Sequence, residues 1–497
     1  MKFVYLSACS AALLAGASPA LADVSAAELW AQWQENYATT GQTLTADVEE
    51  TSDGLILRNF TAVLGQATGD TTTQLSEIAL VETGDGGVRI EPANPVRLTS
   101  VITDGDDELG TMEFLITFTD LNAVASGEIG NIAYDVSAAE IRMVDGEAVS
   151  FGDEAPDLNL DIRLLDTAMT YTLEGSTAED SVFNIAASIS GLTAALDGTA
   201  PDTEDGSFRM RAAAGDLDLT YDGTLNAFRA MQISDGGSAP ETFFMNSVLS
   251  YSRFGYDIEG TDPITRFSIA MANNGGRIST EISNERLTYA LMGSGLDFDL
   301  SSSDIPVPVS VNAESTRMGI SIPTAPSDAP ADMALNLDFN GVTMSEDIWG
   351  LFDPGAALPR DPAVLRLVAT GTAQLFTSLI GFDPMQLSGP PGELRSVDLE
   401  DLEISAAGAS LTGTGSVTFT PGRMIPEPVG SVELALQGLN GLLDRLTQAG
   451  LLPPEQAGMA RGMAGMFARP GAAADTLEST IEFSEGGSIT ANGFPLR

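Results

Sequence analysis

The sequence predicts a mainly β fold, a long antiparallel meander whose curved sheet forms a groove or a sandwich, with a few helices. Three observations support this prediction. Apolar residues alternate with polar or acidic ones along short runs such as residues 158–164 (LNLDIRL) and 296–300 (LDFDL), as in antiparallel strands with one solvated face. Clusters of glycine, asparagine and aspartate separate these runs. Helical periodicity is strongest at the opening of the chain and in a hairpin near its C-terminus.

An export signal is the first element of the chain. Residues 1–22 contain a single lysine, an apolar run over residues 3–14 and a small-residue site that ends in Ala22. This pattern is typical of a secretory signal peptide, so we expect cleavage after Ala22 and a periplasmic protein, with secretion as the alternative. The segment that ends at Cys9 resembles a lipoprotein cleavage box, but the apolar core continues beyond it, which favours Ala22. No later run approaches about 18 apolar residues, so we expect no transmembrane span in the exported chain.

The composition limits the chemistry that the chain can perform. Its 497 residues include 70 Asp and Glu, 22 Lys and Arg, and no His. Lys2 is the only lysine and Cys9 the only cysteine, and both lie in the predicted signal. Residues 23–497 therefore lack imidazole, thiol and lysine amine groups, which excludes most acid–base and nucleophilic catalysis, disulfides and the usual ligands of transition metals. We predict a protein that is not an enzyme, with no catalytic residue and no cofactor.

The charge balance limits the partners. Over residues 23–497, 21 arginines against 70 carboxylates give a net charge of 21 − 70 = −49. Such a chain repels nucleic acid and anionic lipid surfaces. Calcium could use carboxylates, but the densest acidic run, residues 104–108 (DGDDE), does not fit an EF-hand loop, because Leu109 and Leu115 stand where Gly and Glu are needed. We interpret this run as a solvated loop and predict no metal site.

Residues 23–330 are expected to form one region, an N-terminal helix followed by the β meander. A capping box at Ser25 and Glu28 starts the helix, and Trp30 and Trp33 lie on one of its faces. An exposed face with two tryptophans would be adhesive. We therefore expect it to pack against the sheet, with stacking on a ligand as the alternative.

The meander carries two recurring signals. Turn residues at 84–87 (GDGG), 235–237 (DGG) and 273–276 (NNGG) predict β-hairpins. Five of the eight tyrosines also occur in one local context, at spacings of 37, 50, 35 and 33 residues, which are too uneven for a solenoid. These tyrosines are Tyr134, Tyr171, Tyr221, Tyr256 and Tyr289. We expect them to line one side of the sheet.

Residues 331–497 are expected to form an α+β region after a linker at residues 325–330 (APSDAP). The pair Asp361-Pro362 is predicted to cap and start a helix over residues 364–368. Residues 349–354 (WGLFDP) predict a packed Ω-type turn, with an aromatic clamp at the mouth of a groove as the alternative.

A helical hairpin is predicted over residues 439–468, inserted between strands. Its first helix places leucines at i, i+3, i+4 and i+7 on one face, and three methionines and a phenylalanine mark an apolar face on its second helix. These residues are Leu439, Leu442, Leu443, Leu446, Met459, Met463, Met466 and Phe467. Each helix is too short to be stable alone, so the hairpin is expected to cap one end of the sheet. An adaptable, Met-rich binding surface is the alternative.

Four segments resemble a known family. They are the opening DVSAAELWAQWQ, the segment WGLFDPGAALPRDP, the hairpin GLLDRLTQAGLLPPEQA and the closing GSITANGFPL. Together they resemble the DUF2125 family of uncharacterised exported proteins of alphaproteobacteria, over nearly the full length after the signal. The resemblance transfers no catalytic residue. The ending is also similar to the C-terminal portions of AsmA-like envelope proteins, which implies lipid handling or outer-membrane maintenance, although AsmA-like proteins usually keep an N-terminal anchor.

Three classes of function agree with these observations. The first is a non-catalytic periplasmic protein that binds lipid or another envelope component on the apolar face of a curved sheet, and it is the one we favour. The second is a carboxylate-dependent glycan hydrolase, which needs only two acidic side chains, although an aromatic content of 6% is low for sugar stacking. The third is a purely structural, oligomer-forming envelope protein.

Overall fold

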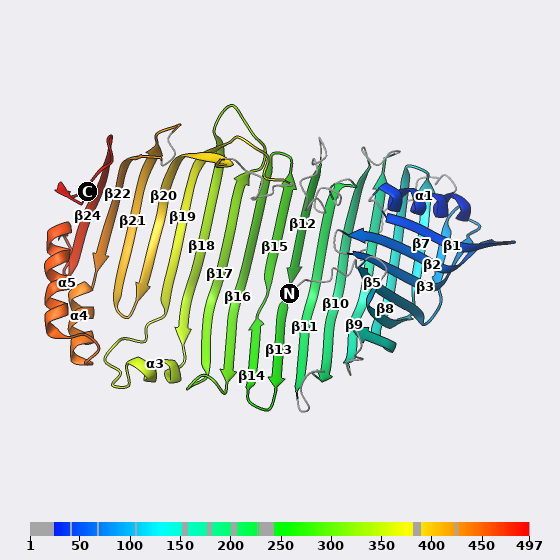
Figure 1. Cartoon of the computed structure of the whole chain (residues 1–497), viewed down its shortest axis with the longest axis horizontal. Coiled ribbons are helices and arrows are strands. Elements are labelled where there is room, and N and C mark those ends of the chain that lie inside the picture. Colours follow the sequence, from blue (N-terminus) through cyan, green and yellow to red (C-terminus); the bar gives the residue numbers. More distant parts are fainter. Residues whose placement is uncertain are drawn as a thin grey trace. The chain divides into compact units, whose positions relative to one another are not determined.

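The computed structural model describes residues 24–39, 42–66, 69–104, 107–151, 158–175, 181–199, 206–225, 227, 243–380, 389–422 and 426–496. Contacts divide the chain into two compact units. Unit 1 comprises residues 1–233 and 238–269, and unit 2 comprises residues 234–237 and 270–497. The described pairings in both units are antiparallel and join mostly strands that follow one another in the chain (Figure 1). The predicted mainly β fold, an antiparallel meander with few helices, is therefore confirmed.

The described residues of unit 1 form one long helix and thirteen strands. They are α1 (Ala26–Thr39), β1 (Gln42–Thr51), β2 (Gly54–Gln66), β3 (Gly69–Glu82), β4 (Val88–Pro92), β5 (Val96–Asp104), β6 (Asp107–Thr119), β7 (Asn122–Glu128), β8 (Asn131–Phe151), β9 (Leu158–Glu174), β10 (Val182–Thr199), β11 (Ser207–Thr224), β12 (Phe244–Tyr251) and β13 (Arg253–Thr261). Strand β14 (Arg266–Asn273) spans the division between the units.

The described residues of unit 2 form the remaining strands and three helices. They are β15 (Gly276–Ser283), β16 (Arg286–Ser302), β17 (Val309–Pro323), β18 (Ala331–Met344), α3 (Glu346–Phe352), β19 (Ala363–Leu375), β20 (Gly392–Ala406), β21 (Ala409–Phe419), β22 (Pro428–Gln437), α4 (Leu439–Gln448), α5 (Pro454–Phe467), β23 (Arg469–Pro470), β24 (Thr476–Ser484), β25 (Ser488–Ala491) and β26 (Phe494–Pro495).

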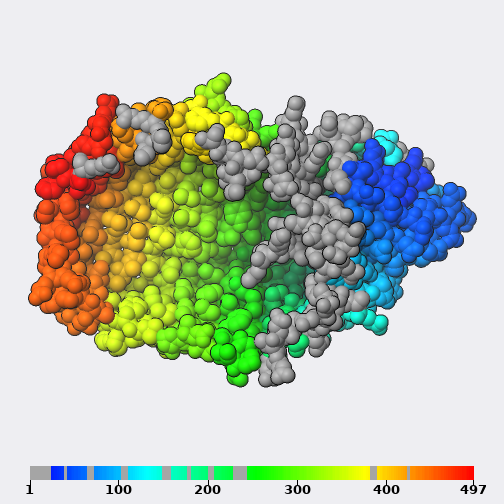
Figure 2. Space-filling view, viewed as in Figure 1, coloured from blue at the N-terminus to red at the C-terminus, as the bar shows by residue number. Residues whose placement is uncertain are grey.

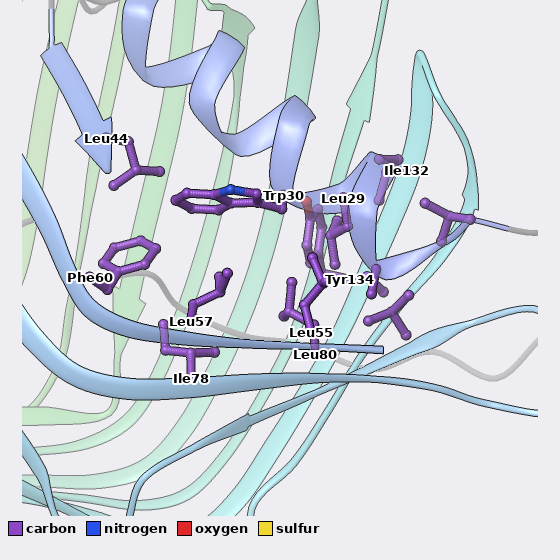
Figure 3. Packing of buried hydrophobic residues seen from close by; sticks show 14 residues of the cluster. Leu29, Trp30, Leu44, Leu55, Leu57, Phe60, Ile78, Leu80, Ile132 and Tyr134 are labelled. Atoms are coloured by element: carbon purple, nitrogen blue, oxygen red, sulfur yellow. The ribbon is translucent and has the colours of Figure 1, made fainter. Parts of the chain in front are cut away.

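Helix α1 covers the apolar side of the first strands of unit 1 (Figure 3). The predicted capping box is present, because the Ser25 hydroxyl donates to the Glu28 carboxylate at 2.7 Å and accepts from the Glu28 amide at 3.3 Å. Trp30 is buried, and its ring lies 5.7 Å from that of Phe60 on β2. The prediction that the tryptophan face packs in the core is confirmed.

An aromatic row continues from this core across the strands of unit 1. The Trp33 indole N–H donates to the Tyr134 hydroxyl at 2.9 Å, and the rings of Tyr134 and Tyr171 lie 5.2 Å apart on paired positions of β8 and β9. Phe183 of β10 stacks on Tyr221 of β11 at 5.0 Å. The expected alignment of tyrosines is therefore confirmed for Tyr134, Tyr171 and Tyr221.

The long strands share an interruption about halfway along their length. Across it, the apolar residues of a strand move from odd-numbered to even-numbered positions, or the reverse. In unit 1, Asp166 of β9 and Asp216 of β11 have φ angles of 44° and 45°, and the ladders on either side of them keep the same register. Apolar side chains before and after the interruption still lie on the same face of the sheet. Tyr251 of β12 and Phe254 of β13 flank the interruption, and their rings lie 6.1 Å apart. Such left-handed residues bend and twist a strand as bulges do, which curves the sheet.

The strands of unit 2 have a similar interruption, with glycines in the left-handed conformation. Gly295 of β16 and Gly341 of β18 have φ angles of 60° and 66°, which a residue with a Cβ rarely adopts. The apolar positions of β16 change from odd numbers, ending at Leu291, to even numbers, starting at Leu296, across this level. The same curvature is therefore expected in both units.

The three predicted β-hairpin turns do not all agree with the structure. Residues 84–87 join β3 to β4 as a hairpin, as predicted, whereas residues 235–237 lie outside the described residues. The prediction of a hairpin at 273–276 is wrong. Strands β14 and β15 both pair with β16, and the Asn274 amide donates to the Ser294 carbonyl of that strand at 2.8 Å. The glycines there interrupt one long strand instead of reversing it.

Two further sequence features take a different form in unit 2. Residues 325–330, predicted as a linker, turn β17 into β18, which pair with each other, and the division between the units lies earlier in the chain than residue 330. The predicted helix over residues 364–368 is wrong, because β19 occupies this segment and pairs with both β18 and β20. An Asp-Pro pair begins a strand as readily as a helix, and the pairing partners on both sides decide the outcome.

The helical hairpin is confirmed. Helices α4 and α5 lie between β22 and β24, which pair directly with each other. The Asp475 carboxylate accepts from the amides of Asn440 and Gly441 at 3.1 and 3.0 Å, which satisfies the free amides at the start of α4. Leu443 on the inner face of α4 is buried.

Candidate ligand-binding face

Three rows of mostly apolar side chains run across eight paired strands of unit 2, from β16 to β24. Residues paired across an antiparallel ladder point to the same face, so the registers define each row. The first row is Tyr289, Ile320, Leu335, Ala369, Leu399, Gly415, Val432 and Ile481; the second is Leu291, Met318, Leu337, Leu367, Leu402, Gly413, Leu434 and Ser479; the third is Gly293, Thr316, Phe339, Leu365, Ile404, Leu411, Leu436 and Leu477. We call these rows the apolar face.

A bulge in β20 keeps the rows continuous. Leu399 and Leu402 are three residues apart, an odd spacing that would place them on opposite faces of a regular strand. The register shifts between these two residues, and they pair with Gly415 and Gly413, which are two residues apart on β21. The extra residue of the bulge therefore holds both leucines on the apolar face.

The opposite face of the same strands carries alternating charges. Arg317, Asp338, Arg366 and Glu403 are paired in register across β17, β18, β19 and β20. The Arg366 guanidinium lies 2.9 Å from the Glu403 carboxylate and 3.6 Å from that of Asp338, and Arg317 lies 3.9 Å from Asp338. Each of these residues is next in sequence to a member of the second apolar row. The two faces of the sheet are thus clearly distinguished in chemistry.

Side chains of the apolar face remain accessible to solvent. Tyr289 is 37% exposed, Met318, Ile320 and Leu365 are 40% exposed, and Ile404 is 43% exposed. The described residues therefore place no closed second layer over these positions. Eight strands about 4.8 Å apart and three rows about 7 Å apart give an area on the order of 500 Å². Contiguous apolar patches of this size on soluble proteins are often functional.

Unit 2 also has a hollowed surface. Figure 2 shows the hollow over strands coloured from green through yellow to orange, which belong to this unit. The helices of unit 2 contact the ends and margins of the strands, with α3 against β17 and α4 against β21. The predicted choice between a groove and a sandwich is thus resolved in favour of an open sheet over the described part of unit 2.

A tight turn follows α3 at one end of these strands. The Asp353 side chain is 1% exposed and accepts from the amides of Ala357 and Leu358 at 3.0 and 2.9 Å and from the Arg360 guanidinium at 2.5 Å. These donors, Arg360 first, hold the pKa of Asp353 below its usual range. The Arg360 guanidinium lies 4.3 Å from the centre of the Trp349 ring. The prediction of a packed Ω-type turn over residues 349–354 is wrong for residues 349–352, which belong to α3 and include no buried residue. Arg360 contacts the Trp349 ring, so this ring is not open as a clamp.

The methionine face of α5 differs from the expectation that it would pack against a platform. Met459, Met463 and Met466 are 62%, 49% and 52% exposed, whereas Ala457 on the other side of the helix is buried. The hairpin therefore docks through its small residues and through α4. The methionines form a second accessible apolar surface.

A polar pocket of about 490 Å³ lies in unit 1. Its lining includes Asp197, Arg209 and Glu259, and Arg209 pairs with both carboxylates at 3.3 and 3.2 Å. Arg211 and Arg209 lower the pKa of Asp197, whereas the general acid of a glycan hydrolase needs a raised pKa. Asp197 therefore does not fit the role of a general acid.

The described residues offer neither a metal site nor a helix that could cross a membrane. In that part of the chain, no group of three or more His, Cys, Asp and Glu residues could hold a metal ion. None of the helices resolved there is long and apolar enough to cross a membrane.

Comparison with known proteins identifies a family. A family model described as "Uncharacterized protein conserved in bacteria (DUF2125)" matches residues 238–496, just over half of the chain. The chain belongs to the DUF2125 family. The match includes the apolar face and the α4–α5 hairpin. No curated protein and no solved structure matches the chain.

Sequence reasoning named no site residue and missed the continuity of the apolar face. The alternation in residues 296–300 and 335–339 shows that each strand has an apolar side, and this signal was read. Alignment of the rows depends on the bulge between Leu399 and Leu402. Apolar residues three apart in a strand-like run, followed by renewed alternation, were the available signal.

Proposed function

We propose that this member of the DUF2125 family is a non-catalytic periplasmic envelope protein that binds lipid acyl chains on the apolar face of unit 2. The observation that carries the proposal is the unbroken set of three apolar rows with about 40% exposure at Met318, Ile320 and Leu365. Leaving such a surface in water forgoes about 25 cal/mol for each Å² that a ligand could cover. The face is therefore a strong candidate for a binding surface.

The chemistry of the rows favours an acyl chain over a polar ligand. Their polar members are the Tyr289 hydroxyl, Thr316 and Ser479, and the other side chains are aliphatic or Phe339, with glycine where two strands approach closely. A sugar or nucleotide would find few hydrogen-bond partners there, and its polar groups would lose their hydration without compensation. A long, flexible aliphatic ligand loses little by leaving water.

The side-chain inventory favours a binding role. Residues 23–497 contain no His, Cys or Lys, and the pocket carboxylate Asp197 is held ionised by arginine. The predicted signal peptide and the resemblance of the C-terminal end to AsmA-like envelope proteins point to the same compartment and ligand class. Both remain predictions from sequence.

The test compares lipid that co-purifies with the native chain and with two matched variants. A face variant, Ile320→Thr/Leu365→Thr/Ile404→Thr, makes the apolar face polar. A control variant, Met292→Thr/Val364→Thr/Val368→Thr, makes the same kind of change on the opposite face, since Met292 pairs with Arg317 and Val368 with Asp401. We expect lipid by mass spectrometry, and binding of a fluorescent fatty acid, in the native chain and the control but not in the face variant.

Two outcomes would contradict the proposal. The first is a native chain that carries no lipid and ignores the fluorescent fatty acid. The second is equal lipid content in the face variant and the native chain. A stoichiometric envelope protein that is lost from the face variant alone would instead support protein binding on the same rows.

A further inference from the structure

Exposed carboxylates line both ends of the strands that carry the apolar face. These strands alternate in direction, so the segments that join them form two rims, one where β16 begins and one where it ends. We call them the first and the second rim. Exposed acidic residues of these segments include Glu285, Asp328 and Glu485 at the first rim and Asp304, Asp347 and Asp361 at the second. The three apolar rows between the rims carry no charged side chain.

The arginines of unit 2 are already engaged by other groups. Four of them lie near the rims, and each has a carboxylate, a hydroxyl or a backbone carbonyl as a partner at 2.5–3.1 Å. They are Arg286 and Arg395 at the first rim and Arg360 and Arg445 at the second. The other arginines in the described part of this unit also have partners. A phosphate or carboxylate placed at either rim would therefore have to displace an existing contact to reach a cation.

The charge around the apolar face opposes an anion. Residues 270–497 contain 11 arginines and 27 carboxylates, a net charge of 11 − 27 = −16, within a chain of −48. Such an excess gives a surface potential of several kT, which disfavours an anion and favours a cation. The rows offer no charged group, so a bound lipid keeps its polar head at a rim or in the water beyond it. The head group is therefore the part of the ligand that this charge selects.

We propose that the apolar face selects acyl lipids whose head group carries no net negative charge, and that it binds cationic, amine-headed chains most tightly. This inference rests on the proposed function, because it concerns the head group of the same ligand. Contact between the acyl chain and the rows supplies affinity, and the carboxylates of the rims supply the preference among head groups. Free fatty acids still bind, but more weakly than their neutral esters.

Three probes with the same chain and different heads test this preference. They are a fluorescent long-chain fatty acid, its methyl ester and the corresponding primary amine, each titrated into the full chain at neutral pH and low salt. The amine should bind more tightly than the ester. The dissociation constant of the acid should exceed that of the ester by about tenfold or more, as a potential of several kT implies. Equal constants for the three heads, or tightest binding of the acid, would overturn the proposal.

Salt provides a second test because it screens charge. The Debye length falls from about 30 Å at about 0.01 M salt to about 3 Å at about 1 M. Raising the salt should tighten binding of the acid and weaken binding of the amine, both relative to the ester, so that the three constants converge. The ester is the reference for the general effect of salt on apolar binding. A ratio of acid to ester that stays constant over this range would contradict selection by charge.

Neutralised variants test whether the rims, and not the net charge alone, make the selection. The first-rim variant is Glu285→Gln/Asp328→Asn/Glu485→Gln, and the second-rim variant is Asp304→Asn/Asp347→Asn/Asp361→Asn. The matched control, Asp53→Asn/Asp85→Asn/Glu128→Gln, removes three exposed carboxylates from unit 1. One rim variant should bring the acid and ester constants closer by a factor of about three or more beyond the control, which identifies the rim that holds the head. Equal effects of all three variants would contradict a head group at a rim.

The Ile320→Thr/Leu365→Thr/Ile404→Thr variant separates this inference from the proposed function. It keeps every rim carboxylate but loses apolar contacts, so all three probes should bind it weakly. An amine that binds this variant as well as it binds the native chain would show attraction to the acidic surface alone and would overturn the proposal. An ester that does not bind the native chain would overturn the proposed function as well. Tight, equal binding of the three probes would leave that function standing and remove only the selection.

Discussion

The two units build the same kind of antiparallel sheet but treat its apolar side differently. In unit 1, α1 lies over the first strands, and Leu29 of this helix is fully buried together with Leu57 and Leu80 of the strands. In unit 2, the buried apolar residues among those described are few and lie mostly at the margins. They are Ala313, Leu358, Leu375, Leu443, Ala457 and Ala491.

In unit 1 the apolar side of the sheet contributes to stability as a core, whereas in unit 2 it stays accessible to a ligand. A helix laid over strands turns an apolar face into a core, whereas unit 2 keeps its helices at strand ends and leaves the rows of β16 to β24 open. The sheet of unit 2 is stabilised by its long ladders and by charged rungs such as the one through Arg366 on the opposite face. The comparison predicts that substitutions in the two units have different consequences.

The largest expected effect is on the core of unit 1. Leu57→Ala removes a fully buried side chain and should lower the free energy of unfolding by roughly 2–5 kcal/mol, whereas Leu365→Ala, at a position 40% exposed, should cost less than about 1.5 kcal/mol. Urea unfolding followed by tryptophan fluorescence measures both, because Trp30 and Trp33 report on unit 1 and Trp349 reports on unit 2. Equal losses at the two leucines would remove the distinction between the units.

A smaller effect is expected where α1 joins the aromatic row. Trp33→Phe keeps most of the ring but removes the N–H that donates to the Tyr134 hydroxyl at 2.9 Å. The loss should be about 1–2 kcal/mol in unit 1, since a half-buried hydroxyl loses a partner. Unfolding of unit 2, followed at Trp349 in the same samples, is the internal control and should not change.

A pH dependence is expected in unit 2. The Arg360 guanidinium and two backbone amides lower the pKa of Asp353 in the folded chain, so the carboxylate binds its proton more weakly there than in the unfolded chain. Its contribution to stability is therefore present above the unfolded pKa of about 3.9 and is lost as the pH falls through the lower folded value. Asp353→Asn should lower the thermal midpoint of unit 2 at pH 7 and reduce its decline between pH 5 and pH 3. An unchanged midpoint at pH 7 would contradict the role assigned to this turn.

The smallest stability effect is expected on the apolar face itself. Ile320→Thr/Leu365→Thr/Ile404→Thr changes three exposed positions on strands, where threonine is a favourable residue. The free energy of unfolding should change by less than about 1 kcal/mol per site, although bound lipid is lost. A collapse of unit 2 in this variant would indicate that the face is a core covered in the native protein.

The sequence predicts the local pattern well and the long-range arrangement less well. Alternation identifies strands because side chains of a strand point to opposite faces, and the capping box at Ser25 places the start of α1 correctly. The glycines at 273–276 carry the same signal as a hairpin, but pairing of β14 and β15 with one strand makes them an interruption. Whether an apolar side is covered cannot be read from alternation, because it depends on where a distant helix such as α1 docks.

The apolar face could not be predicted from the sequence because it also depends on long-range arrangement. Each row is assembled from eight strands spread over residues 286–484, and the bulge in β20 is needed to hold Leu399 and Leu402 in neighbouring rows. The methionine stripe of α5 was visible as a helical pattern, but its exposure depends on which side of the hairpin packs against the sheet. Local spacing identified both surfaces as apolar without deciding their accessibility.

The most direct test of the central claim maps where an acyl chain binds. The full chain would be incubated with a photoreactive fatty acid, irradiated and digested, and the labelled peptides identified by mass spectrometry. We expect labels on residues of the apolar face between β16 and β22, with loss of labelling in the Ile320→Thr/Leu365→Thr/Ile404→Thr variant. Labels that fall mainly in unit 1, or that persist in this variant, would contradict the account.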